Sequence, residues 1–383
     1  MFNILLNDRR AEDSKLMVDV IVIGAGLTGL ICAQQLQQAG YRVVVVEKSR
    51  GLGGRLATRR LQAGWADHGV RCLEVQGVLT QQVIQALNDR QILHLWTDTL
   101  YQLDKDRMLH PSTDVHPRYV SSTGITAVAK FLGTGLEIWR SQRVQAIQLT
   151  SDRQWALTLE PAGVAPMPDL VAQAIVMAIP APQALMLLEP LADQGFPTDF
   201  LAMLRSVKFD PCLTAIATFP TQHTHFANLP WSAIYPDDPE LAWIGIDSTK
   251  CLTAQQPVLV IQSTASFAQT YLESPDLQPI GQYLLSRVAE SLLSWLGSLQ
   301  ELQIHRWRYA FVQHPWQGTH LATHSPLPLV CSGDWCGGNQ IEGALRSGLA
   351  SANQINAYWQ GVSLTERNAE TQLVQLIQQI SEG

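Results

Sequence analysis

A glycine-rich βαβ pattern near the start of the chain constrains its fold more than any other feature. Residues 19–23 and 42–46 are apolar segments that we interpret as strands flanking a helix. Gly24, Gly26 and Gly29 form G-x-G-x-x-G where that helix begins. In this motif the first glycine permits a tight turn, the second lets backbone approach a pyrophosphate, and the third lets helix pack on strand. The pattern predicts a dinucleotide-binding unit.

An acidic residue follows the second strand. Glu47 lies 18 residues beyond Gly29, where a carboxylate accepts hydrogen bonds from the ribose of an AMP half. The helix N-terminus offers unpaired N–H groups and a positive dipole end to the phosphates. The other contacts predicted for this turn and strand end are Ala25, Leu27, Thr28 and Lys48.

A second glycine-rich element favours FAD over a nicotinamide cofactor. Residues 50–55 read R-G-L-G-G-R, which a nicotinamide dehydrogenase does not need after its second strand. Gly53 and Gly54 let backbone lie against a flat ligand without a Cβ clash. Arg55 offers a forked pair of donors to a pyrophosphate. The alternative is a surface loop with a solvated arginine, but its place directly behind the fingerprint favours non-covalently bound FAD.

Composition and charge limit the partners. The 383 residues suggest two domains. A net charge of −7 gives no basic field for nucleic acid or anionic lipid. No apolar run approaches the roughly 20 residues that span a bilayer, and the six cysteines lack metal-ligand spacing. We therefore expect a cytoplasmic protein with reduced thiols, no metal, and neither a nucleic-acid nor a membrane partner.

The fold class predicted is α/β, with a three-layer Rossmann-like FAD-binding domain and an interleaved β-rich α+β substrate domain. Strands of the first domain are predicted at residues 143–149, 154–159, 172–179 and 329–332. The second is predicted to hold strands at residues 212–219, 241–246, 258–263 and 303–309 and a helix at 281–296. The expected boundaries are a flexible extension at 1–17, the FAD-binding domain at 18–85, 117–185 and 325–360, the substrate domain at 86–116 and 186–324, and a tail at 361–383.

Residues 333–352 form a second motif, in which a helix begins near residue 341 after a strand and a turn. Ala344, Gly348 and Ala352 recur every four residues and make one small-residue face. Such a face lets the helix approach another backbone closely. A tight helix–sheet contact explains it as well as a cofactor site does.

With these motifs the chain resembles the amine-oxidase-like flavoproteins, which combine G-x-G-x-x-G, an acid and a following G-G-R element. Within this group it is most similar to the renalase-like proteins of bacteria and cyanobacteria, over residues 18–359. The supporting segments are A-T-R-R at 57–60, A-D-H-G at 66–69, P-R-Y-V-S-S-T-G-I-T-A at 117–127, A-I-P-A-P-Q-A at 178–184, H-R-W-R-Y-A at 305–310 and G-D-W at 333–335. One departure is V-R-C-L at 70–73, where relatives commonly have a small residue, Gln and aromatics. In relatives this segment approaches the flavin. The departure therefore implies an altered substrate preference.

The resemblance implies further flavin contacts. The start of the C-terminal helix would point its dipole at the flavin pyrimidine, where negative charge collects on reduction. The implied contacts are Asp67, His68, Val144, Gly333, Asp334, Ile341, Glu342, Gly343 and Ala344, with Asp334 on the ribityl or phosphate portion. His68 is an equal candidate for anchoring its loop. Cys336 would lie near the ring edge, as an inert thiol rather than a covalent flavin link.

Renalase-like proteins oxidise the 2- and 6-dihydro isomers of NAD(P) to NAD(P)⁺, with hydride transfer to flavin N5 and reoxidation by O2 to H2O2. The resemblance therefore implies an FAD-dependent oxidase with a small-molecule substrate. A dihydropyridine is electron-rich and needs no general base, so the cofactor carries the chemistry. The candidate substrate-orienting residues are Trp243, Arg308, Tyr309 and Trp335, although residues 305–309 also fit an ordinary strand.

Two other functions stay open. The first is oxidation of a primary or secondary amine, for which related enzymes often place a lysine and a water at flavin N5. The candidate lysines for that role are Lys208 and Lys250. The second is FAD binding without turnover, which the altered residues 70–73 hint at. The sequence carries no signal for an oligomeric state.

Overall fold

The computed structural model describes residues 15–62, 64–160, 169–222, 224–251, 253–254, 256–293, 296, 299–338, 340–360 and 369–382. The chain divides into two compact units. Unit 1 comprises Met1–Gly54, Ala129–Lys208 and His314–Gly383, and unit 2 comprises Arg55–Val128 and Phe209–Gln313.

Unit 1 is built on a mixed sheet with a parallel centre. Strand β1 (Lys15–Ile23) pairs in parallel with β2 (Val43–Glu47) and β13 (Asp169–Met177). The strand order is β10-β2-β1-β13-β12-β11, with β20 on β13 and β19 on β20. The outer strands are β10 (Glu137–Arg140), β11 (Val144–Leu149), β12 (Trp155–Leu159), β19 (Leu321–Thr323) and β20 (Leu329–Cys331). Burial of the central strands on both faces explains their unbroken apolar sequences.

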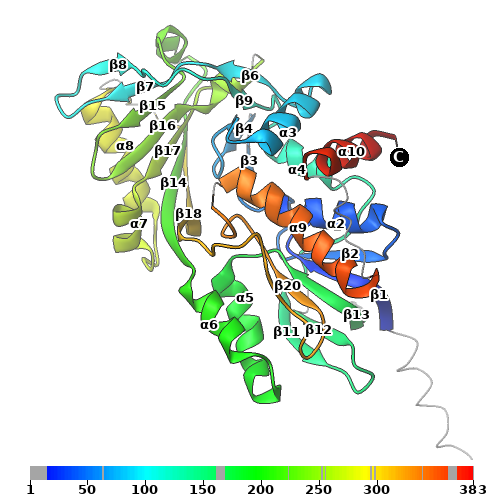
Figure 1. Ribbon diagram of the computed structural model, residues 1–383. Coiled ribbons are helices and arrows are strands. Elements are labelled where there is room, and N and C mark those ends of the chain that lie inside the picture. The colour runs from blue at the N-terminus through cyan, green and yellow to red at the C-terminus, as the bar shows by residue number, and fades with distance from the viewer. Residues whose placement is uncertain are drawn as a thin grey trace, which may run out of the picture. The chain divides into compact units, whose positions relative to one another are not determined.

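Two helices of unit 1 come from distant parts of the chain. Helices α2 (Leu27–Gln38) and α9 (Gln340–Gln360) run side by side in Figure 1, in blue and orange. Helix α10 (Ala369–Glu382) packs on both of them. The other helical elements are α4 (Thr126–Leu132), α5 (Ala181–Leu188), η1 (Glu189–Gln194) and α6 (Thr198–Ser206). Helix α5 begins directly after Pro180, which ends the preceding extended segment.

Unit 2 contains a seven-stranded sheet in the order β18-β14-β17-β16-β15-β7-β8. Its strands are β7 (Tyr101–Leu103), β8 (Leu109–Pro111), β14 (Lys208–Thr218), β15 (Ala233–Pro236), β16 (Leu241–Ile246), β17 (Val258–Ser263) and β18 (Glu301–His314). Helices α7 (Ala265–Tyr271) and α8 (Gln278–Ser291) lie along it (Figure 1, yellow). Leu284 and Val288 of α8 join Ile244 and Ile261 of the sheet in one buried cluster.

Short elements of unit 2 carry its most polar interior. Strands β3 (Thr58–Leu61) and β4 (Gly64–Asp67) form one antiparallel pair. Strand β9 (Arg118–Val120) lies between β5 (Leu73–Glu74) and β6 (His94–Thr97). The remaining elements are α3 (Val78–Asp89) and the short helices η2 (Thr224–Asn228) and η3 (Asp247–Lys250). Because β4 contacts η3, residues far apart in the sequence meet there.

The units divide the chain at other points than the sequence-based boundaries. Residues 55–85 and 117–128 lie in unit 2, and residues 186–208 and 314–324 lie in unit 1. Residues 15–17, assigned to a flexible extension, pair with residues 169–171 as part of β1. Residues 369–382 of the expected tail form α10. The rest of the extension, residues 1–14, and residues 361–368 of the tail lie outside the described residues.

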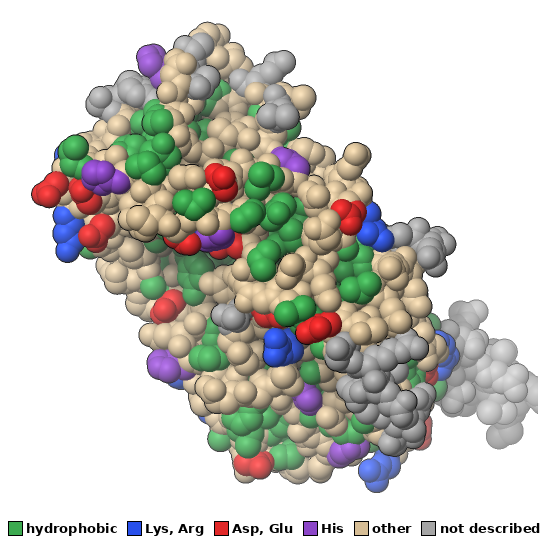
Figure 2. Space-filling view, turned by 45° about the horizontal axis from the view of Figure 1, so that its top comes forward, with side chains coloured by type: hydrophobic (Ala, Val, Ile, Leu, Met, Phe, Trp, Pro, Cys, Tyr) green, Lys and Arg blue, Asp and Glu red, His purple; other side chains and the backbone are tan. Residues whose placement is uncertain are grey.

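Charged residues make up 15% of the chain, and on the face in Figure 2 they stand singly or in small groups of mixed sign between polar and apolar atoms. In the part of the chain that the structure describes, every helix is too short or too polar to cross a bilayer. No group of His, Cys, Asp or Glu side chains within that part has the geometry of a metal site.

Candidate cofactor and substrate sites

The three glycines of the fingerprint have different surroundings. A Cβ on Gly24, whose φ is +104°, would lie 2.6 Å from the Ala178 carbonyl oxygen. A Cβ on Gly29 would lie 2.0 Å from the Gly24 carbonyl oxygen. A Cβ on Gly26 would meet no atom within 4 Å. Packing therefore requires glycine at the first and third positions, whereas Gly26 borders open space at the N-terminus of α2.

Glu47 is held rigidly beside this turn. Its side chain is buried, and its Oε2 accepts a hydrogen bond of 2.8 Å from the Ala25 amide. Its Oε1 accepts another of 2.7 Å from the Ser49 amide. Each carboxylate oxygen has a second lone pair for a hydroxyl donor. The geometry fits the expected role of Glu47 toward a ribose.

The second glycine-rich element lies against the first. The Gly53 amide donates a hydrogen bond of 2.8 Å to the Ala25 carbonyl, and Gly26 and Gly53 pair as a short parallel bridge. Gly53 and Gly54 have φ values of +108° and +58°, which favour glycine. Open space at Gly26, the N-terminus of α2 and a fixed Glu47 together form a cradle. The residues of unit 1 thus fit the AMP and pyrophosphate portions of a dinucleotide.

The small-residue face of α9 packs on α2. The structural explanation that the sequence offers for this face is a contact between the helix and a sheet, but the observed contact is with another helix. Thr28 Oγ1 donates to the Ala344 carbonyl at 3.0 Å. A Cβ on Gly348 would lie only 2.7 Å from the Thr28 carbonyl oxygen. Because Thr28 and Ala344 both lie near helix starts, the positive ends of two helix dipoles meet here.

Gly348→Leu is expected to lower the free energy of unfolding by about 3 kcal/mol, the upper end of the range for overpacking, because the new side chain would enter the backbone of α2. Urea denaturation of the holoenzyme measures this. Ala357→Leu, at an exposed position of the same helix, is the matched control and should leave the midpoint nearly unchanged. Equal midpoints for the two variants would contradict the close helix contact.

The G-D-W-C segment is largely buried in unit 1. The Gly333 amide donates to Ser347 Oγ at 3.1 Å. Trp335, a candidate substrate contact, is 1% exposed and its indole N–H donates to the Ile179 carbonyl at 3.1 Å. Burial raises the pKa of the Cys336 thiol well above its ordinary value, which favours the inert thiol over a covalent flavin link.

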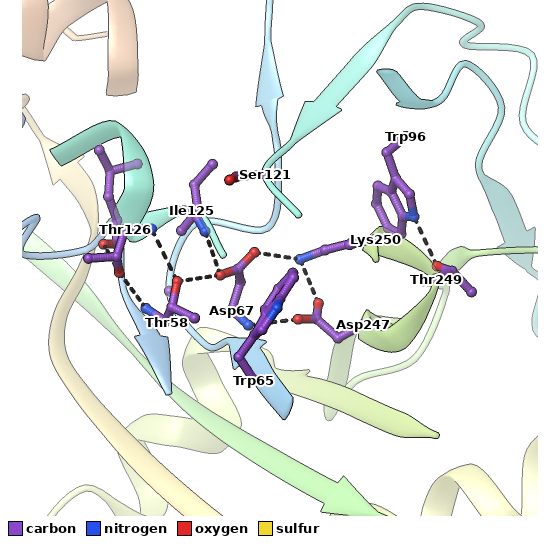
Figure 3. Close-up of polar contacts among 12 residues, drawn as sticks. Thr58, Trp65, Asp67, Trp96, Ser121, Ile125, Thr126, Asp247, Thr249 and Lys250 are labelled. Carbon is purple, nitrogen blue, oxygen red and sulfur yellow. Dashed lines mark hydrogen bonds and ion pairs between the residues drawn. The ribbon is translucent and has the colours of Figure 1, made fainter. Parts of the chain in front are cut away.

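A buried ion cluster in unit 2 brings together residues that the sequence analysis treated separately (Figure 3). Asp67 accepts hydrogen bonds from Thr58 Oγ1 at 2.7 Å and from the Ile125 amide at 2.8 Å. Its other oxygen is 3.1 Å from Lys250 Nζ. The same ammonium is 2.5 Å from Asp247 Oδ1, and Asp247 Oδ2 accepts from the Asp67 amide at 2.7 Å. The three charged side chains are at most 3% exposed.

Two carboxylates therefore share one ammonium. Burial raises the pKa of Asp247 to about 6, and Asp67 adds to this while Lys250 opposes it. Burial lowers the pKa of Lys250, but Asp247 and Asp67 outweigh it and hold that pKa above its usual value. Trp96 covers the ammonium at 5.4 Å and is itself held by Thr249 through a 2.9 Å hydrogen bond. Lys250 is consequently a permanent cation.

A second cluster in unit 2 is aromatic and neutral. The His68 ring contacts His305 at 4.5 Å and stacks on Trp307 at 5.2 Å. The His68 carbonyl accepts hydrogen bonds from Thr214 Oγ1 and from the Trp307 indole, at 3.0 and 2.8 Å. Burial lowers the pKa of His68 to about 3 and that of His305 to about 4, and Arg59 adds to both effects. His68 thus anchors its loop within unit 2.

Acid is expected to destabilise the protein through these histidines. Their folded pKa values lie below the unfolded value, so between pH 6.5 and about 4 the unfolded state binds more protons. Each histidine then removes about 1.4 kcal/mol of stability per pH unit as the pH falls. Asp247, whose pKa is raised to about 6, gains stability as the pH falls from 6 to 4 and so opposes the loss from the histidines. The contribution of a histidine is therefore measured by comparing the native protein with a histidine variant.

Denaturant unfolding at several pH values, with the native protein and His305→Phe, provides that comparison. The variant should lose less stability on acidification, with a slope smaller by about 1.4 kcal/mol per pH unit. Parallel pH profiles would show that His305 titrates normally in the folded protein.

Arg71 lies in the segment, residues 70–73, that departs from the renalase-like pattern. Its guanidinium stands 4.7 Å from the ring centre of Trp243 and 5.6 Å from that of Tyr235. Arg71 Nε donates to Gln262 Oε1 at 2.6 Å. Trp243, a predicted substrate contact, is 2% exposed, so this part of unit 2 presents a cation backed by aromatic rings.

The other predicted substrate contacts of unit 2 lie on β18. The exposed Arg308 forms a two-pronged ion pair with Glu273. Tyr309 meets Phe209 edge-on at 5.6 Å. Residues 305–309 form part of the regular strand β18. An ordinary strand was the alternative to a substrate-binding segment in the sequence analysis.

Four more predicted cofactor contacts are placed by the structure, three with polar partners and one, Val144, by burial alone. Arg55 donates to the Ala310 carbonyl at 3.1 Å in unit 2. Lys48 Nζ donates to Gln183 Oε1 at 3.3 Å in unit 1. Val144 is buried at the start of β11, where the register shifts. Glu342 is buried in the first turn of α9 and pairs with Arg346 at 3.3 Å.

Sequence reasoning missed Asp247, Arg71 and Gln262. The only local signal for the ion cluster is the spacing of Asp247 and Lys250, which places an acid and a base three residues apart. The sequence marks Arg71 only as a member of residues 70–73, the segment that departs from the renalase-like pattern. Gln262 lies in an apolar strand, where a buried amide needs a hydrogen-bond partner, and it finds two in Arg71 and the Gly69 carbonyl.

The fold agrees with comparisons to known proteins. The model of the flavin containing amine oxidoreductase family matches residues 90–356, and that of an NAD(P)-binding Rossmann-like domain matches residues 22–87. The chain belongs to the flavin-containing amine oxidoreductases. The mixed α/β fold and FAD as cofactor are thereby confirmed.

Solved structures share the fold at low sequence identity. Putrescine oxidase with bound putrescine has a TM-score of 0.63 and 13% identity, covering 90% of this chain and 100% of that one. Cyclohexylamine oxidase from Brevibacterium oxydans IH-35A has a TM-score of 0.64 and 13% identity, covering 89% of this chain and 99% of that one.

Similarity to curated relatives is confined to short segments. The L-amino acid dehydrogenase of Synechocystis sp. is 44% identical over 52 residues, which are 13% of this chain and 11% of the relative. The L-amino-acid oxidase of Siganus canaliculatus is 48% identical over 52 residues, 13% of this chain and 10% of the relative. The matched segment thus spans about a tenth of either relative.

Proposed function

We propose that the protein is an FAD-dependent oxidase of renalase-like type, which oxidises 2- or 6-dihydro-NAD(P) to NAD(P)⁺. Bound FAD would supply a hydride acceptor that returns two electrons to O2, with H2O2 as the product. The cradle around Gly26 and Glu47 would bind the cofactor, and the N-termini of α2 and α9 would favour negative charge beside it. The rings of Trp243 and Tyr235 in unit 2, with Arg71 over them, would orient the substrate.

The observation that carries this proposal is the state of Lys250. Amine oxidases of the type considered often use a lysine whose amine holds a water, but the Lys250 ammonium is fully buried and engaged by Asp67 and Asp247. Lys105 and Lys208, the other lysines of the expected substrate domain, are both exposed, and Lys208 donates to the Arg205 carbonyl at 3.0 Å. An electron-rich dihydropyridine requires no such base, which agrees with this arrangement.

Amine oxidation is the second candidate, because the structural neighbours include oxidases of putrescine and cyclohexylamine. The short matches to an L-amino acid dehydrogenase and an L-amino-acid oxidase point to amino acids. Both would be two-electron oxidations at the same flavin.

Anaerobic mixing of the holoenzyme with 6-dihydro-NAD(P), 2-dihydro-NAD(P), ordinary NAD(P)H and a panel of amines and amino acids tests the proposal. Rapid bleaching of the flavin absorbance by a dihydronicotinamide isomer alone, reversed by air with release of H2O2, is the expected result. Bleaching by an amine or amino acid would instead establish the second candidate. A flavin that no reductant bleaches would indicate a binding protein without turnover.

A further inference from the structure

Arg71 has the surroundings of a ligand-binding cation rather than of a structural one. It is half-buried, its guanidinium faces the rings of Trp243 and Tyr235, and both are held in the sheet of unit 2. The two rings pack edge-to-face at 5.0 Å, which fixes the wall behind the cation. Arginine stacked on aromatic rings keeps its in-plane N–H donors directed away from the ring faces.

Neighbouring backbone and side chains fix the direction of Arg71. Gln262 is 2% exposed and accepts from Arg71 Nε at 2.6 Å, while its Nε2 donates to the Gly69 carbonyl at 2.9 Å. A Cβ on Gly69 would lie 2.1 Å from the Arg55 carbonyl oxygen, so the backbone leading to Arg71 is held closely. The guanidinium is thereby preorganised, which lowers the entropic cost of binding a ligand.

The charge of Arg71 is not balanced by a carboxylate. Among the described residues, none of the ion pairs within 4.0 Å includes Arg71. Glu74, on the same stretch of chain, is 2.9 Å from Arg118 and 3.2 Å from His116. A guanidinium has five N–H donors; Gln262 takes the one on Nε and the Tyr235 side chain engages another, which leaves donors for a ligand. A half-buried cation with spare donors is stabilised by an anionic partner.

We propose that Arg71 binds an oxyanion of the substrate, a carboxylate or a phosphoryl group, against the wall of Trp243 and Tyr235. This inference rests on the proposed function, since it takes the ligand to be the substrate of the oxidase. Dinucleotides and amino acids carry such a group. Simple amines such as putrescine and cyclohexylamine do not, and their ammonium form would be repelled by Arg71. An oxyanion is thus the feature that separates this chain's substrates from putrescine and cyclohexylamine.

Binding of three probes of similar shape to the holoenzyme tests the charge requirement without turnover. Benzoate carries a carboxylate, phenyl phosphate a phosphoryl group, and benzamide is neutral. Titration calorimetry should show that the native protein binds at least one anion more tightly than benzamide. Arg71→Gln should weaken that anion about 10- to 100-fold, the range expected for loss of charge-assisted hydrogen bonds, and leave benzamide unchanged.

Further variants separate charge from folding. Arg71→Lys keeps the charge and should retain part of the anion preference. Gln262→Glu would place a carboxylate against Arg71 and should lower anion binding as Arg71→Gln does. Arg140→Gln, at an exposed site of β10, is the control for a lost positive charge. Equal anion affinity in the native protein and Arg71→Gln, or the same loss in Arg140→Gln, would overturn the proposal.

Turnover of matched substrates separates failure of this inference from failure of the proposed function. L-Phenylalanine differs from 2-phenylethylamine by a carboxylate, and 6-dihydro-NAD differs from the corresponding dihydronicotinamide riboside by its phosphates. Arg71→Gln should lower kcat/KM about 10- to 100-fold only for the anionic member of whichever pair is oxidised, mainly through KM. Equal losses of kcat/KM for both members of a pair would refute the oxyanion site. Oxidation of the amino-acid pair alone, with the loss confined to L-phenylalanine, would refute the dihydronicotinamide assignment and still support the oxyanion site.

Discussion

Lys250→Ala is expected to destabilise the protein by about 3–5 kcal/mol, because it leaves two buried carboxylates with no counter-charge. Asp67 would keep its hydrogen bonds from Thr58 and Ile125, but Asp247 would face Asp67 without the ammonium between them. The loss should be greatest above pH 6. Removing the cation raises the pKa of Asp247 further, and a carboxyl with a raised folded pKa loses stability as the pH rises through that value.

Urea denaturation of the holoenzyme at pH 5 and pH 8 measures both effects. Lys208→Ala removes an exposed lysine and should cost less than about 0.5 kcal/mol. The double variant Lys250→Met/Asp247→Asn removes one charge of each sign and should recover part of the loss. Lost turnover at unchanged stability of Lys250→Ala would instead identify a catalytic lysine and favour amine oxidation.

Gly26→Val is expected to leave the protein folded but without its flavin. The φ of Gly26 is −75° and a Cβ there meets no atom within 4 Å, so the fold accepts a side chain. The same side chain would fill the space where phosphate oxygens meet the N-terminus of α2. Losing two charge-assisted hydrogen bonds of about 1.5 kcal/mol each lowers FAD affinity by about 100-fold.

Gly29→Val is the matched comparison, because its Cβ would lie 2.0 Å from the Gly24 carbonyl oxygen. We expect that variant to lose stability as well as flavin. Flavin content from the absorbance spectrum, together with thermal unfolding of the apoprotein and the holoprotein, distinguishes the two. Full flavin occupancy in Gly26→Val would contradict the placement of the pyrophosphate.

Local sequence predicted the parts of the fold that depend on local physics. The apolar strands around the fingerprint appear as β1 and β2, and the helix between them as α2. Glu47, Gly53 and Gly54 are predicted to serve the same ligand, and the hydrogen bonds of Ala25 join Glu47 to Gly53. Turn glycines and continuous apolar strands have few alternative conformations, which is why these elements were predictable.

Long-range pairing was not predictable in the same way. Asp67 and Lys250 are separated by 183 positions, and neither residue type indicates the other as its partner. The small-residue face of α9 was expected to accept a close backbone, but small side chains do not specify whether that backbone belongs to a strand or a helix. The boundaries shifted because the β3–β4 pair joins unit 2 through the contact of β4 with η3.

The strand pairing in the central sheet of unit 1 also determines when unit 1 can finish folding during synthesis. Strand β13 pairs with β1 from the start of the chain and with β20 from beyond residue 328, and α2 rests on a helix that begins at Gln340. The ribosome therefore finishes all of unit 2 before the last partners of β13 and α2 emerge. A nascent chain shorter than about 340 residues exposes the apolar side of α2, so this stage is the one at which chaperones have an apolar surface to bind.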